Sequence, residues 1–258
     1  RLGLVAADAP NITSESISQE VRLLSANPGR FQWILGAYAF NLKASAGIRA
    51  VSVPGGPGTP EGMTLFQPKL ETTSYAGFGE GTYELVDSLF FTAGVRYTWE
   101  KREIAQRING ANILPGQKSF DKVTYRAALR YNFADDANIY ASYGTGYKSG
   151  VFNYTSAARV PVAPETITSY EVGLKADPLS WLRTNLSVFY YDYKNLQAIA
   201  RDATGTQFVL QNAGTAEIYG GELEVQAAVS DALKLRGSLA YTHANYTNFP
   251  RAQSFQPL

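Results

Sequence analysis

The chain has 258 residues, with 23 Lys and Arg against 22 Asp and Glu, and its formal net charge is +1. This balance gives no indication of a nucleic-acid partner. The sequence has no cysteine and one histidine, which excludes disulfides, structural zinc sites and cysteine-dependent catalysis.

No segment approaches the roughly 20 consecutive apolar residues of a membrane-spanning helix. Seventeen tyrosines and 13 phenylalanines nevertheless give a high aromatic content beside a mean hydropathy of −0.18. The apolar run LGLVAA near the start is too short for the core of a signal peptide. We interpret it as the end of a truncated strand, and the chain as a mature form or a fragment.

Short turn signals divide the chain into strand-like stretches. They occur at 27–30 (NPGR), 86–88 (VDS), 134–137 (ADDA), 177–180 (DPLS) and 230–232 (SDA). Asp, Asn, Pro and Gly favour turns because they preset φ, tolerate positive φ or bond their own backbone. The pattern predicts ten strands, at 16–25, 31–42, 71–85, 89–100, 122–133, 138–148, 167–176, 181–193, 216–229 and 233–245.

The remaining connections are long, at 43–70, 101–121, 149–166 and 194–215. The first contains PGGPGTPEG (54–62), which is unsuited to a strand ladder and is a candidate lid. The last is interpreted as a strand extension around DATG (202–205). Short and long connections therefore alternate, as they do in a transmembrane β-barrel with short periplasmic turns and long external loops.

Alternate residues of a strand point to opposite faces. In the stretch NIYASYGTGYKSGVFN (138–153), one face carries Ile139, Ala141, Tyr143, Thr145 and Tyr147, and the other carries Asn138, Tyr140, Ser142, Gly144, Gly146 and Lys148. A half-buried strand of a soluble sheet would look similar. This strand alone therefore does not distinguish lipid from a protein core.

Five further strands show the same sorting, with apolar faces over 89–99, 123–133, 170–174, 219–229 and 235–243. None of these faces carries Asp, Glu, Lys or Arg, although 17% of the chain is charged. A cation facing lipid at the midplane costs about 2–4 kcal/mol, which gives a physical reason for the sorting. Leu89, Val95, Leu129, Leu223 and Leu239 are predicted to face outward, and Arg96, Arg126, Arg130, Glu171, Glu222 and Arg236 inward.

Aromatic residues such as Tyr97, Trp99, Tyr131 and Phe133 lie near strand ends, as an interfacial girdle requires. Ten residues at about 3.4 Å each, tilted by about 45°, rise about 24 Å, close to the apolar band of an outer membrane. The predicted fold is all-β: an antiparallel up-and-down transmembrane β-barrel.

These segments together resemble TonB-dependent outer-membrane receptors. The resemblance rests on ISQEVRLLS (17–25), SYAGFGEGTYELVDSLFFTAGVRYTWEKRE (74–103), NIYASYGTGYKSGVFN (138–153), APETITSYEVGLKAD (163–177) and IYGGELEVQAAVSDALKLRGSLAYT (218–242). It implies a protein of the cell outer membrane that takes up a scarce nutrient, commonly a ferric siderophore. An inner-membrane TonB complex would drive this uptake, with no cofactor.

Family barrels have 22 strands and an N-terminal plug domain. The sequence shows about ten strands and no segment resembling a plug, so residues 1–258 are interpreted as part of the barrel domain. We expect an incomplete, curved sheet from inside a larger receptor. Outer-membrane lipid and a small ligand are the expected partners, and the plug and the TonB complex would act only in the full-length protein.

The inward charges are candidate ligand- or plug-facing groups: Arg96, Arg126, Arg130, Glu171, Glu222, Glu224 and Arg236, with Glu100 and Lys175 beside them. The alternative is a solvated wall of mutually paired charges, which is ordinary in such barrels. Tyr147 and Lys148 are candidates at an external loop, where the alternative is a girdle aromatic with a snorkelling lysine.

Two other functional classes remain open. A soluble or surface-attached β-sandwich, such as an adhesin, would also contain alternating strands. An outer-membrane hydrolase would need a catalytic histidine, and His243 is the only one in the chain. The outward parity of His243 favours a place in the girdle, and we expect no enzymatic activity and no metal site.

Overall fold

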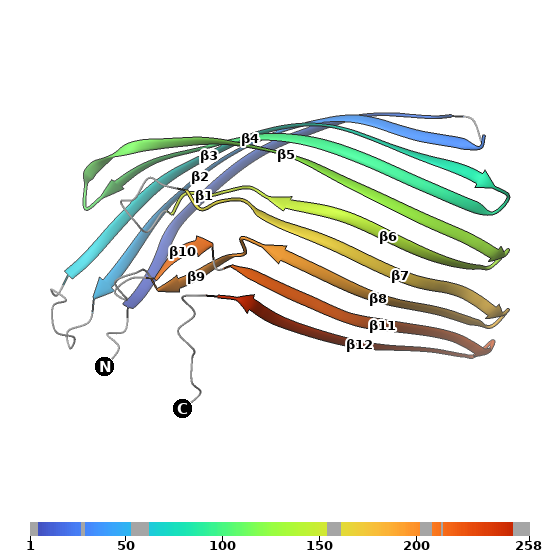
Figure 1. Cartoon of the computed structure of the whole chain (residues 1–258). Helices are drawn as coiled ribbons and strands as arrows, with labels where there is room; N and C mark the ends of the chain where they lie inside the picture. The colour runs from blue at the N-terminus through green and yellow to red at the C-terminus, as the bar shows by residue number, and fades with distance from the viewer. Residues whose placement is uncertain are drawn as a thin grey trace.

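The computed structural model describes residues 5–26, 29–52, 62–153, 161–201, 208–212 and 214–249. These residues form twelve β-strands (Figure 1). The strands are β1 (Val5–Leu24), β2 (Phe31–Ser52), β3 (Gly62–Val86), β4 (Leu89–Ile108), β5 (Ala111–Ala134), β6 (Ala137–Lys148), β7 (Glu165–Leu179), β8 (Leu182–Lys194), β9 (Gln197–Arg201), β10 (Phe208–Asn212), β11 (Thr215–Ser230) and β12 (Leu233–Asn248).

Ten strands form one antiparallel sheet in the order β1-β2-β3-β4-β5-β6-β7-β8-β11-β12. Each strand pairs with its neighbour in sequence, except that β8 pairs with β11 because β9 and β10 form a separate two-stranded sheet. The five short turns lie at one end of the sheet, on the right in Figure 1. The predicted ten-stranded meander and the position of its turns are therefore confirmed.

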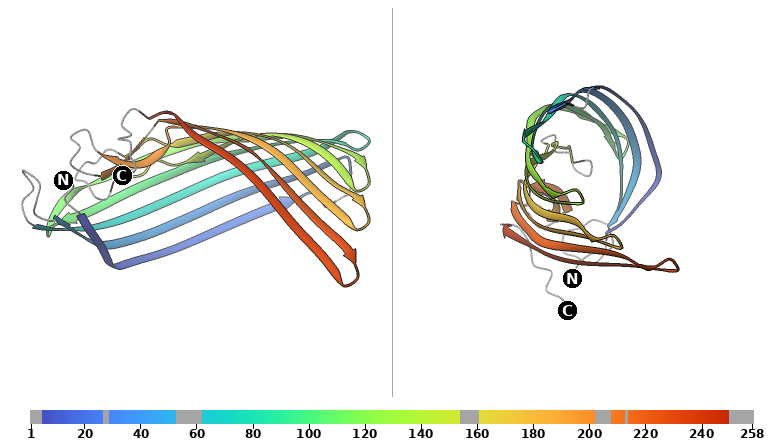
Figure 2. Two further views of the ribbon diagram at one scale, coloured as in Figure 1. Left: turned by 90° about the horizontal axis from the view of Figure 1, so that it is seen from below. Right: turned by 90° about the vertical axis from the view of Figure 1, so that its right-hand side faces the viewer.

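The large sheet is strongly curved and open. Figure 2 shows it end-on as an arc, and β1 and β12 each have a single neighbour within the described sheet. The expected incomplete, curved sheet is confirmed. Among the described residues no helix is long and apolar enough to cross a membrane.

The strands are longer than predicted, and this corrects two of the expected long connections. β2 and β3 continue into 43–52 and 62–70, and β4 and β5 occupy 101–108 and 111–121. Only Asn109 and Gly110 join β4 to β5, both with positive φ (50° and 82°), as a tight hairpin requires. The alternation of short and long connections fails here because the ladder continues beyond the apolar band, where the convex face is polar.

Three smaller expectations also change. The segment 194–215 contains the separate hairpin of β9 and β10 and does not extend β8 and β11. DATG (202–205) lies outside the described residues, as does PGGPGTPEG apart from Gly62, which pairs with Ser52. The turn predicted at 177–180 is displaced, because Asp177 and Pro178 belong to β7 and the chain turns at 180–181.

The connection that follows β6 marks the concave face. Phe152 and Ile104 are the largest fully buried side chains, and both would contact a side chain placed at Gly116 of β5. Figure 2 shows this connection inside the arc of the sheet. The concave face is therefore the lumen side, and Ile104 and Gly116 point toward it. Residues that are in step with them, meaning their partners on neighbouring strands and every second residue along each strand, point the same way.

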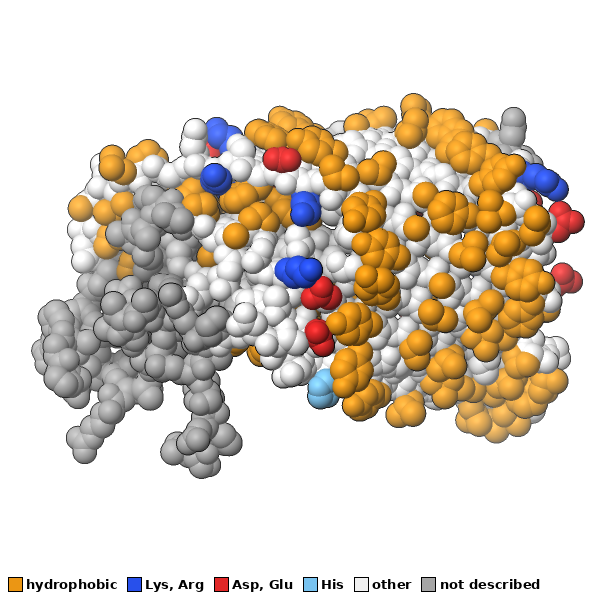
Figure 3. Space-filling model, viewed as in Figure 1, with side chains coloured by type: hydrophobic (Ala, Val, Ile, Leu, Met, Phe, Trp, Pro, Cys, Tyr) orange, Lys and Arg blue, Asp and Glu red, His pale blue; other side chains and the backbone are white. Residues whose placement is uncertain are grey.

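The convex face is apolar and exposed. Its large side chains include Ile17, Val21, Leu35, Val95, Leu129, Val172, Val188 and Leu239, which are each at least 44% exposed. Figure 3 shows this face covered with hydrophobic side chains from the turn end to a border of charged groups. An exposed apolar surface of this extent on one face of a sheet is typical of a protein that faces membrane lipid.

Aromatic rings form a row across this border. Tyr143 lies 5.2 Å from Tyr170, which lies 6.3 Å from Tyr190, and Tyr219 continues the row to His243 at 4.9 Å, all as ring centroid distances. The ladder places these residues directly opposite one another on β6, β7, β8, β11 and β12. His243 therefore belongs to the aromatic girdle.

A lysine at Val188 tests which face meets lipid. Val188 is 53% exposed on the convex face, so in the full-length receptor Val188→Lys should lower the free energy of unfolding by about 2 kcal/mol or more. Urea titration in lipid vesicles, followed by gel mobility, measures this change. The matched control is Ser187→Lys, because Ser187 faces the lumen opposite Glu222. Equal destabilisation by both substitutions would contradict the assignment of faces.

Candidate functional site

The strand ladder brings the predicted inward charges to one face. Arg96 lies on β4 in step with Ile104, and Arg126 and Arg130 lie on β5 in step with Gly116. Partner residues on neighbouring strands point to the same face of the sheet. From β5 to β11 these successive partners are Arg130, Tyr140, Gly173, Ser187 and Glu222, so all five lie on the concave face. The structure thus places Arg96, Arg126, Arg130, Glu171, Glu222, Glu224 and Arg236 on the concave face, and Leu89, Val95, Leu129, Leu223 and Leu239 on the convex face.

Arg126 pairs with a carboxylate that sequence reasoning missed. Its Nε lies 2.8 Å from Glu80 Oε2, although Glu80 is on β3, two strands away. The two side chains meet across Gly94, which lies between them in the ladder. A Cβ at Gly94 would lie 3.0 Å from Glu80 Oε2 and 3.4 Å from Arg126 Cγ. The missing side chain at Gly94 therefore leaves the space that the ion pair occupies.

Arg96 and Arg130 contact aromatic rings. The Arg96 guanidinium carbon lies 5.5 Å from the ring centroid of Tyr38 and 5.4 Å from that of Phe78, while Arg130 lies 4.6 Å from Phe90. Such cation–π contacts hold a guanidinium group without neutralising it. Both arginines therefore keep their charge toward the lumen.

A third cluster lies on β6 and β7. Tyr140 Oη donates a hydrogen bond of 2.5 Å to Glu171 Oε1, and Lys175 Nζ lies 5.5 Å from the Tyr140 ring centroid. The ring lies over Gly173, where a Cβ would come within 2.5 Å of it. Glu171 and Lys175 are thus separated by a tyrosine that contacts both.

Glu224 is held by neutral amides. It accepts hydrogen bonds from Gln226 Nε2 (2.8 Å) and Asn185 Nδ2 (3.4 Å). Arg236 lies opposite Gln226 on β12, an edge strand that is exposed along its whole length. Glu222 lies opposite Ser187 and Ala240.

The inward charges pair only in part among the residues that the structure describes. No ion pair there joins two of the seven predicted lumen residues. Their contacts are instead aromatic rings, amides, the hydroxyls of Thr98 and Tyr140, and Glu80. Glu100 does pair, with Arg102 at 2.7 Å. The concave wall therefore presents cations that retain unused hydrogen-bonding capacity.

Tyr147 and Lys148 occupy the end of β6. The ladder between β5 and β6 stops at Arg126 and Gly144, where Tyr125 N donates to Thr145 Oγ1 (2.9 Å). The Tyr147 hydroxyl is buried, which differs from the expected place on the lipid side. Lys148 is 61% exposed and its Nζ lies 3.8 Å from Glu165 Oε2.

The connection after Lys148 is fixed from the other side by Gln197. Gln197 Nε2 donates to the main-chain oxygens of Ser149 (2.9 Å) and Ala163 (3.1 Å), and its main-chain N–H donates to Glu165 Oε2 (2.8 Å). The Gln197 side chain is buried. One amide therefore joins both ends of the β6–β7 connection to the start of β9.

Asn212 at the end of β10 adds to this junction. Its Nδ2 donates to the main-chain oxygens of Ala163 (2.9 Å) and Asn195 (2.8 Å), and its Oδ1 accepts from Ala163 N (2.7 Å). Asn153 Nδ2 donates to Leu210 O (3.0 Å). We call residues 149–153, 161–165, 195–199 and 210–212 the inner shelf.

Sequence reasoning missed Gln197, Asn212 and Phe152, because the hydrogen-bond partners of Gln197 and Asn212 lie up to 49 positions away and no local pattern signals these three residues. Of the missed residues, Glu80 was the easiest to predict from the sequence, because it lies within FGEG (78–81) at a position whose side chain points inward. Within the described ranges no three metal-ligating side chains gather in one place.

Comparisons with known proteins agree with this geometry. A family model described as "TonB dependent receptor-like, beta-barrel" matches residues 9–256. The chain belongs to this family. It is 29% identical to the ferrichrome outer membrane transporter/phage receptor of Escherichia coli (strain K12) over 161 residues. This matched region covers 62% of this chain and 21% of that protein.

Two further receptors are similar to the chain. The rhizobactin receptor of Rhizobium meliloti (strain 1021) is 26% identical over 101 residues, which is 34% of this chain and 14% of that protein. The crystal structure of the ferric yersiniabactin uptake receptor from Yersinia pestis superposes with a TM-score of 0.80 at 20% identity, over 95% of this chain and 37% of that one. The chain thus spans about a fifth or less of the two curated relatives' length.

Membership of this family places the protein in the outer membrane. The β-sandwich alternative is not favoured, because the described strands form one curved sheet with a small hairpin on its concave side. The similar proteins are receptors and transporters rather than hydrolases. His243 contacts the ring of Tyr219 in the girdle.

A valine at Gly94 tests the space beneath the Arg126–Glu80 pair. We expect Gly94→Val to lower the free energy of unfolding by about 1 kcal/mol, because the new side chain displaces the ion pair. Gly77→Val on the convex face is the control, since a Cβ there meets nothing within 4 Å. In a Glu80→Gln background the penalty should shrink, and an unchanged penalty would show that the ion pair is irrelevant.

Removing the Gln197 amide tests the inner shelf. Gln197→Ala leaves the buried carbonyl of Ser149 without this donor, at a cost of about 1–3 kcal/mol, whereas the carbonyl of Ala163 keeps the hydrogen bond from Asn212. Hydrogen exchange should become faster at 149–153 and 161–165. Gln226→Ala is the control, because this amide is an exposed donor to Glu224. Protection that stays the same in Gln197→Ala would contradict the role of this residue.

Proposed function

We propose that the full-length receptor containing this segment imports a ferric siderophore across the outer membrane, through the lumen that the concave face lines. The observation that carries the proposal is the set of lumen-facing cations. Arg96 and Arg130 lie on aromatic rings, and neither forms an ion pair with a carboxylate among the described residues.

A siderophore holds Fe³⁺ through hard, anionic oxygen donors, and many such complexes carry negative charge at their surface. Guanidinium groups bind oxygen anions through charge-assisted hydrogen bonds, and rings such as Tyr38 and Phe78 bind the planar or apolar parts of a ligand. The names of the similar proteins, which specify ferrichrome, rhizobactin and ferric yersiniabactin, support the same ligand class.

The concave wall has two ends with different tasks in this proposal. Lys175, Glu224 and Arg236 lie toward the short turns, and we assign them to contact with a plug domain of the full-length protein. Tyr147 and Lys148 lie at the opposite end, beside the inner shelf, where an incoming ligand is met first. Coupling to a TonB complex would then reside in the plug and outside this segment.

Uptake of ⁵⁵Fe-loaded siderophores by iron-starved cells tests the proposal. Cells whose only receptor is the full-length protein should take up at least one hydroxamate, catecholate or carboxylate complex in an energy-dependent manner. Arg96→Gln/Arg130→Gln should slow uptake by roughly tenfold, the cost of losing about one charge-assisted hydrogen bond. Arg183→Gln is the control, because Arg183 pairs with Asp177 near a short turn (2.6 Å).

Binding to energy-depleted cells separates the two tasks of the wall. A ligand contact predicts that Arg96→Gln/Arg130→Gln weakens binding as well as uptake. A plug contact predicts slower uptake with unchanged binding. Absence of uptake for all three ligand classes would overturn the proposed function.

A further inference from the structure

Two neighbouring strands of the sheet separate just outside the aromatic girdle. β6 pairs with β5 only as far as Gly144, which lies opposite Arg126. β6 nevertheless continues to Lys148 and stays paired with β7 over this whole length. The separation begins one residue beyond the girdle residue Tyr143. The last part of β6 is therefore held by the ladder on one side only.

A threonine hydroxyl occupies the place of the next main-chain partner in this ladder. Thr145 Oγ1 accepts a hydrogen bond from Tyr125 N (2.9 Å) and donates one to Tyr125 O (3.3 Å). In a continued ladder, the same two groups of Tyr125 would bond the main chain of Thr145. Threonine side chains compete with regular main-chain pairing in this way. One hydroxyl thus ends the pairing between β5 and β6 without ending β6.

The main chain of β5 is oriented for further pairing with β6. Tyr125 directs its N–H and C=O groups toward β6. Alternate residues of a strand direct these groups to the same neighbour, so Val123 and Asp121 also direct theirs toward the line of β6. The pairs that would follow in the observed register are Tyr125 with Thr145, Val123 with Tyr147, and Asp121 with Ser149.

Tyr147 is displaced from the face that the register assigns to it. It lies in step with Tyr143 of the convex face, yet its hydroxyl is buried and has no hydrogen-bond partner among the described residues. The charges of Glu100 and Arg102, which point into the lumen from β4, act on this hydroxyl. A buried hydroxyl without a partner destabilises the structure that contains it. A continued ladder would return Tyr147 to the membrane side, where water reaches its hydroxyl.

The inner shelf holds the end of β6 in the lumen. Gly150 lies between the Phe120 ring and the Val162 carbonyl, and a Cβ placed at Gly150 would overlap both. The Gln197 amide donates to the main-chain oxygen of Ser149 (2.9 Å). In a continued ladder, this same oxygen would accept from the main chain of β5. The contacts of the shelf and the continued ladder therefore exclude one another.

The surface buried between the shelf and the wall is polar enough to be exposed to water. On the concave wall at the level of the shelf, Thr72, Ser74 and Gln106 are each at most 5% exposed. On the shelf, the buried residues include Ser149 and Gln197. Interfaces that never separate are more apolar than this. The shelf can therefore leave the wall without exposing a large apolar surface.

We propose that the end of β6 has two positions. In the position described above, the Thr145 hydroxyl bonds Tyr125 and the inner shelf stands in the lumen mouth (Figure 2). In the other position, the ladder of β5 and β6 continues, Tyr147 turns to the membrane side, and the shelf withdraws from the lumen mouth. β7 moves with β6, because the two strands stay paired as far as Lys148 and Glu165. This device sets the width of the lumen mouth and does not depend on which ligand the receptor imports.

A disulfide that requires the second position tests the proposal. In the continued register, Lys122 and Lys148 would be a non-hydrogen-bonded pair with about 4.5 Å between their Cα atoms, which is within disulfide range. The described chain has no cysteine, and any cysteine elsewhere in the full-length receptor is replaced by serine. Lys122→Cys/Lys148→Cys is then oxidised in isolated outer membranes, and non-reducing gel mobility follows the cross-link. We expect the cross-link to accumulate with time.

The matched control is Lys118→Cys/Lys148→Cys. Lys118 lies on the same face of β5 as Lys122 but four residues further from the girdle. Four residues span about 14 Å along a strand, so this pair should cross-link roughly tenfold or more slowly. Heat-dependent gel mobility verifies that each variant is folded.

Substitutions that disfavour the first position should speed the cross-linking of Lys122→Cys/Lys148→Cys. Thr145→Val removes the hydroxyl that bonds Tyr125 and should raise the rate by roughly tenfold, the effect of losing about one hydrogen bond. Thr145→Ser keeps a hydroxyl and should leave the rate within a few-fold of the unsubstituted background. Gly150→Ala should also raise the rate, because its Cβ overlaps the Val162 carbonyl only while the shelf is on the wall.

Cross-linking of Lys122→Cys/Lys148→Cys that is no faster than in the control would overturn the proposal. Rates in Thr145→Val and Gly150→Ala that do not exceed the rate in Thr145→Ser would also overturn it. Such rates would show one fixed distance between the two cysteines instead of an exchange between two positions.

Discussion

The rest of this structure depends on the backbone hydrogen-bond ladder. Lipid offers no donors or acceptors to main-chain N–H and C=O groups, so a strand in a membrane must pair on both sides. An antiparallel ladder without bulges then fixes the direction of every side chain with a period of two. Arg96 reaches the lumen and Val95 reaches lipid for this reason alone, since the two are adjacent on β4.

The ladder also decides how the inward side chains are accommodated. Four of them lie across a glycine of a neighbouring strand: the Phe78 ring over Gly36, the Tyr140 ring over Gly173, and the paired Glu80 and Arg126 over Gly94. A side chain at any of these glycines would displace its neighbour. Glycine in these strands therefore provides space for large inward groups, which offsets the strand stability that glycine loses.

The parts of the fold that follow from local pattern were predictable. The number of strands in the sheet, the five short turns and the two faces depend only on residues close in sequence. The lengths of β2 to β5 were not, because beyond the apolar band residues such as Lys43 and Glu103 are polar on a face that is apolar nearer the turns. A polar strand and a loop have similar composition there.

The functional residues divide in the same way. Inward parity identified Arg96, Arg126 and Arg130, but their partners Phe78, Glu80 and Phe90 are set by pairing between strands. Gln197 was beyond reach, since its amide bonds Ser149 and Ala163 across a connection of irregular structure. Its effect is visible only once β6, β7 and β9 have been brought together.

Beyond the membrane edge, lipid no longer dictates which face of a strand is apolar, and another interaction must hold the sheet. The inner shelf supplies it. Phe152 and Ile104 are both buried beside Gly116, so the extensions of β4 and β5 gain apolar burial on their concave side.

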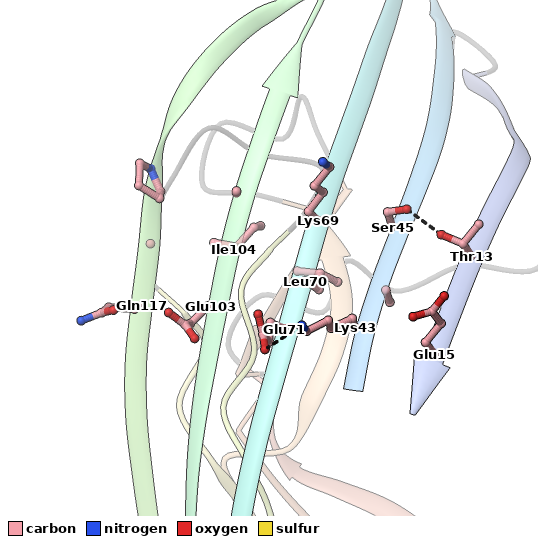
Figure 4. Close-up of a pocket in the computed structure, with 14 residues that line it drawn as sticks. Thr13, Glu15, Lys43, Ser45, Lys69, Leu70, Glu71, Glu103, Ile104 and Gln117 are labelled. Atoms are coloured by element: carbon pink, nitrogen blue, oxygen red, sulfur yellow. Dashed lines mark hydrogen bonds and ion pairs between the residues drawn. The ribbon is translucent and has the colours of Figure 1, made fainter. Parts of the chain in front are cut away.

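Glu103 and Gln117, the neighbours of Ile104 and Gly116 in sequence, line a hollow on the opposite, convex side of β1 to β5 (Figure 4). A buried cluster inside the lumen mouth therefore supports the strands whose convex side forms this hollow. The inner shelf and the hollow lie on opposite faces of the same strands. A substitution that weakens the packing of Phe152 should therefore affect the structure of both.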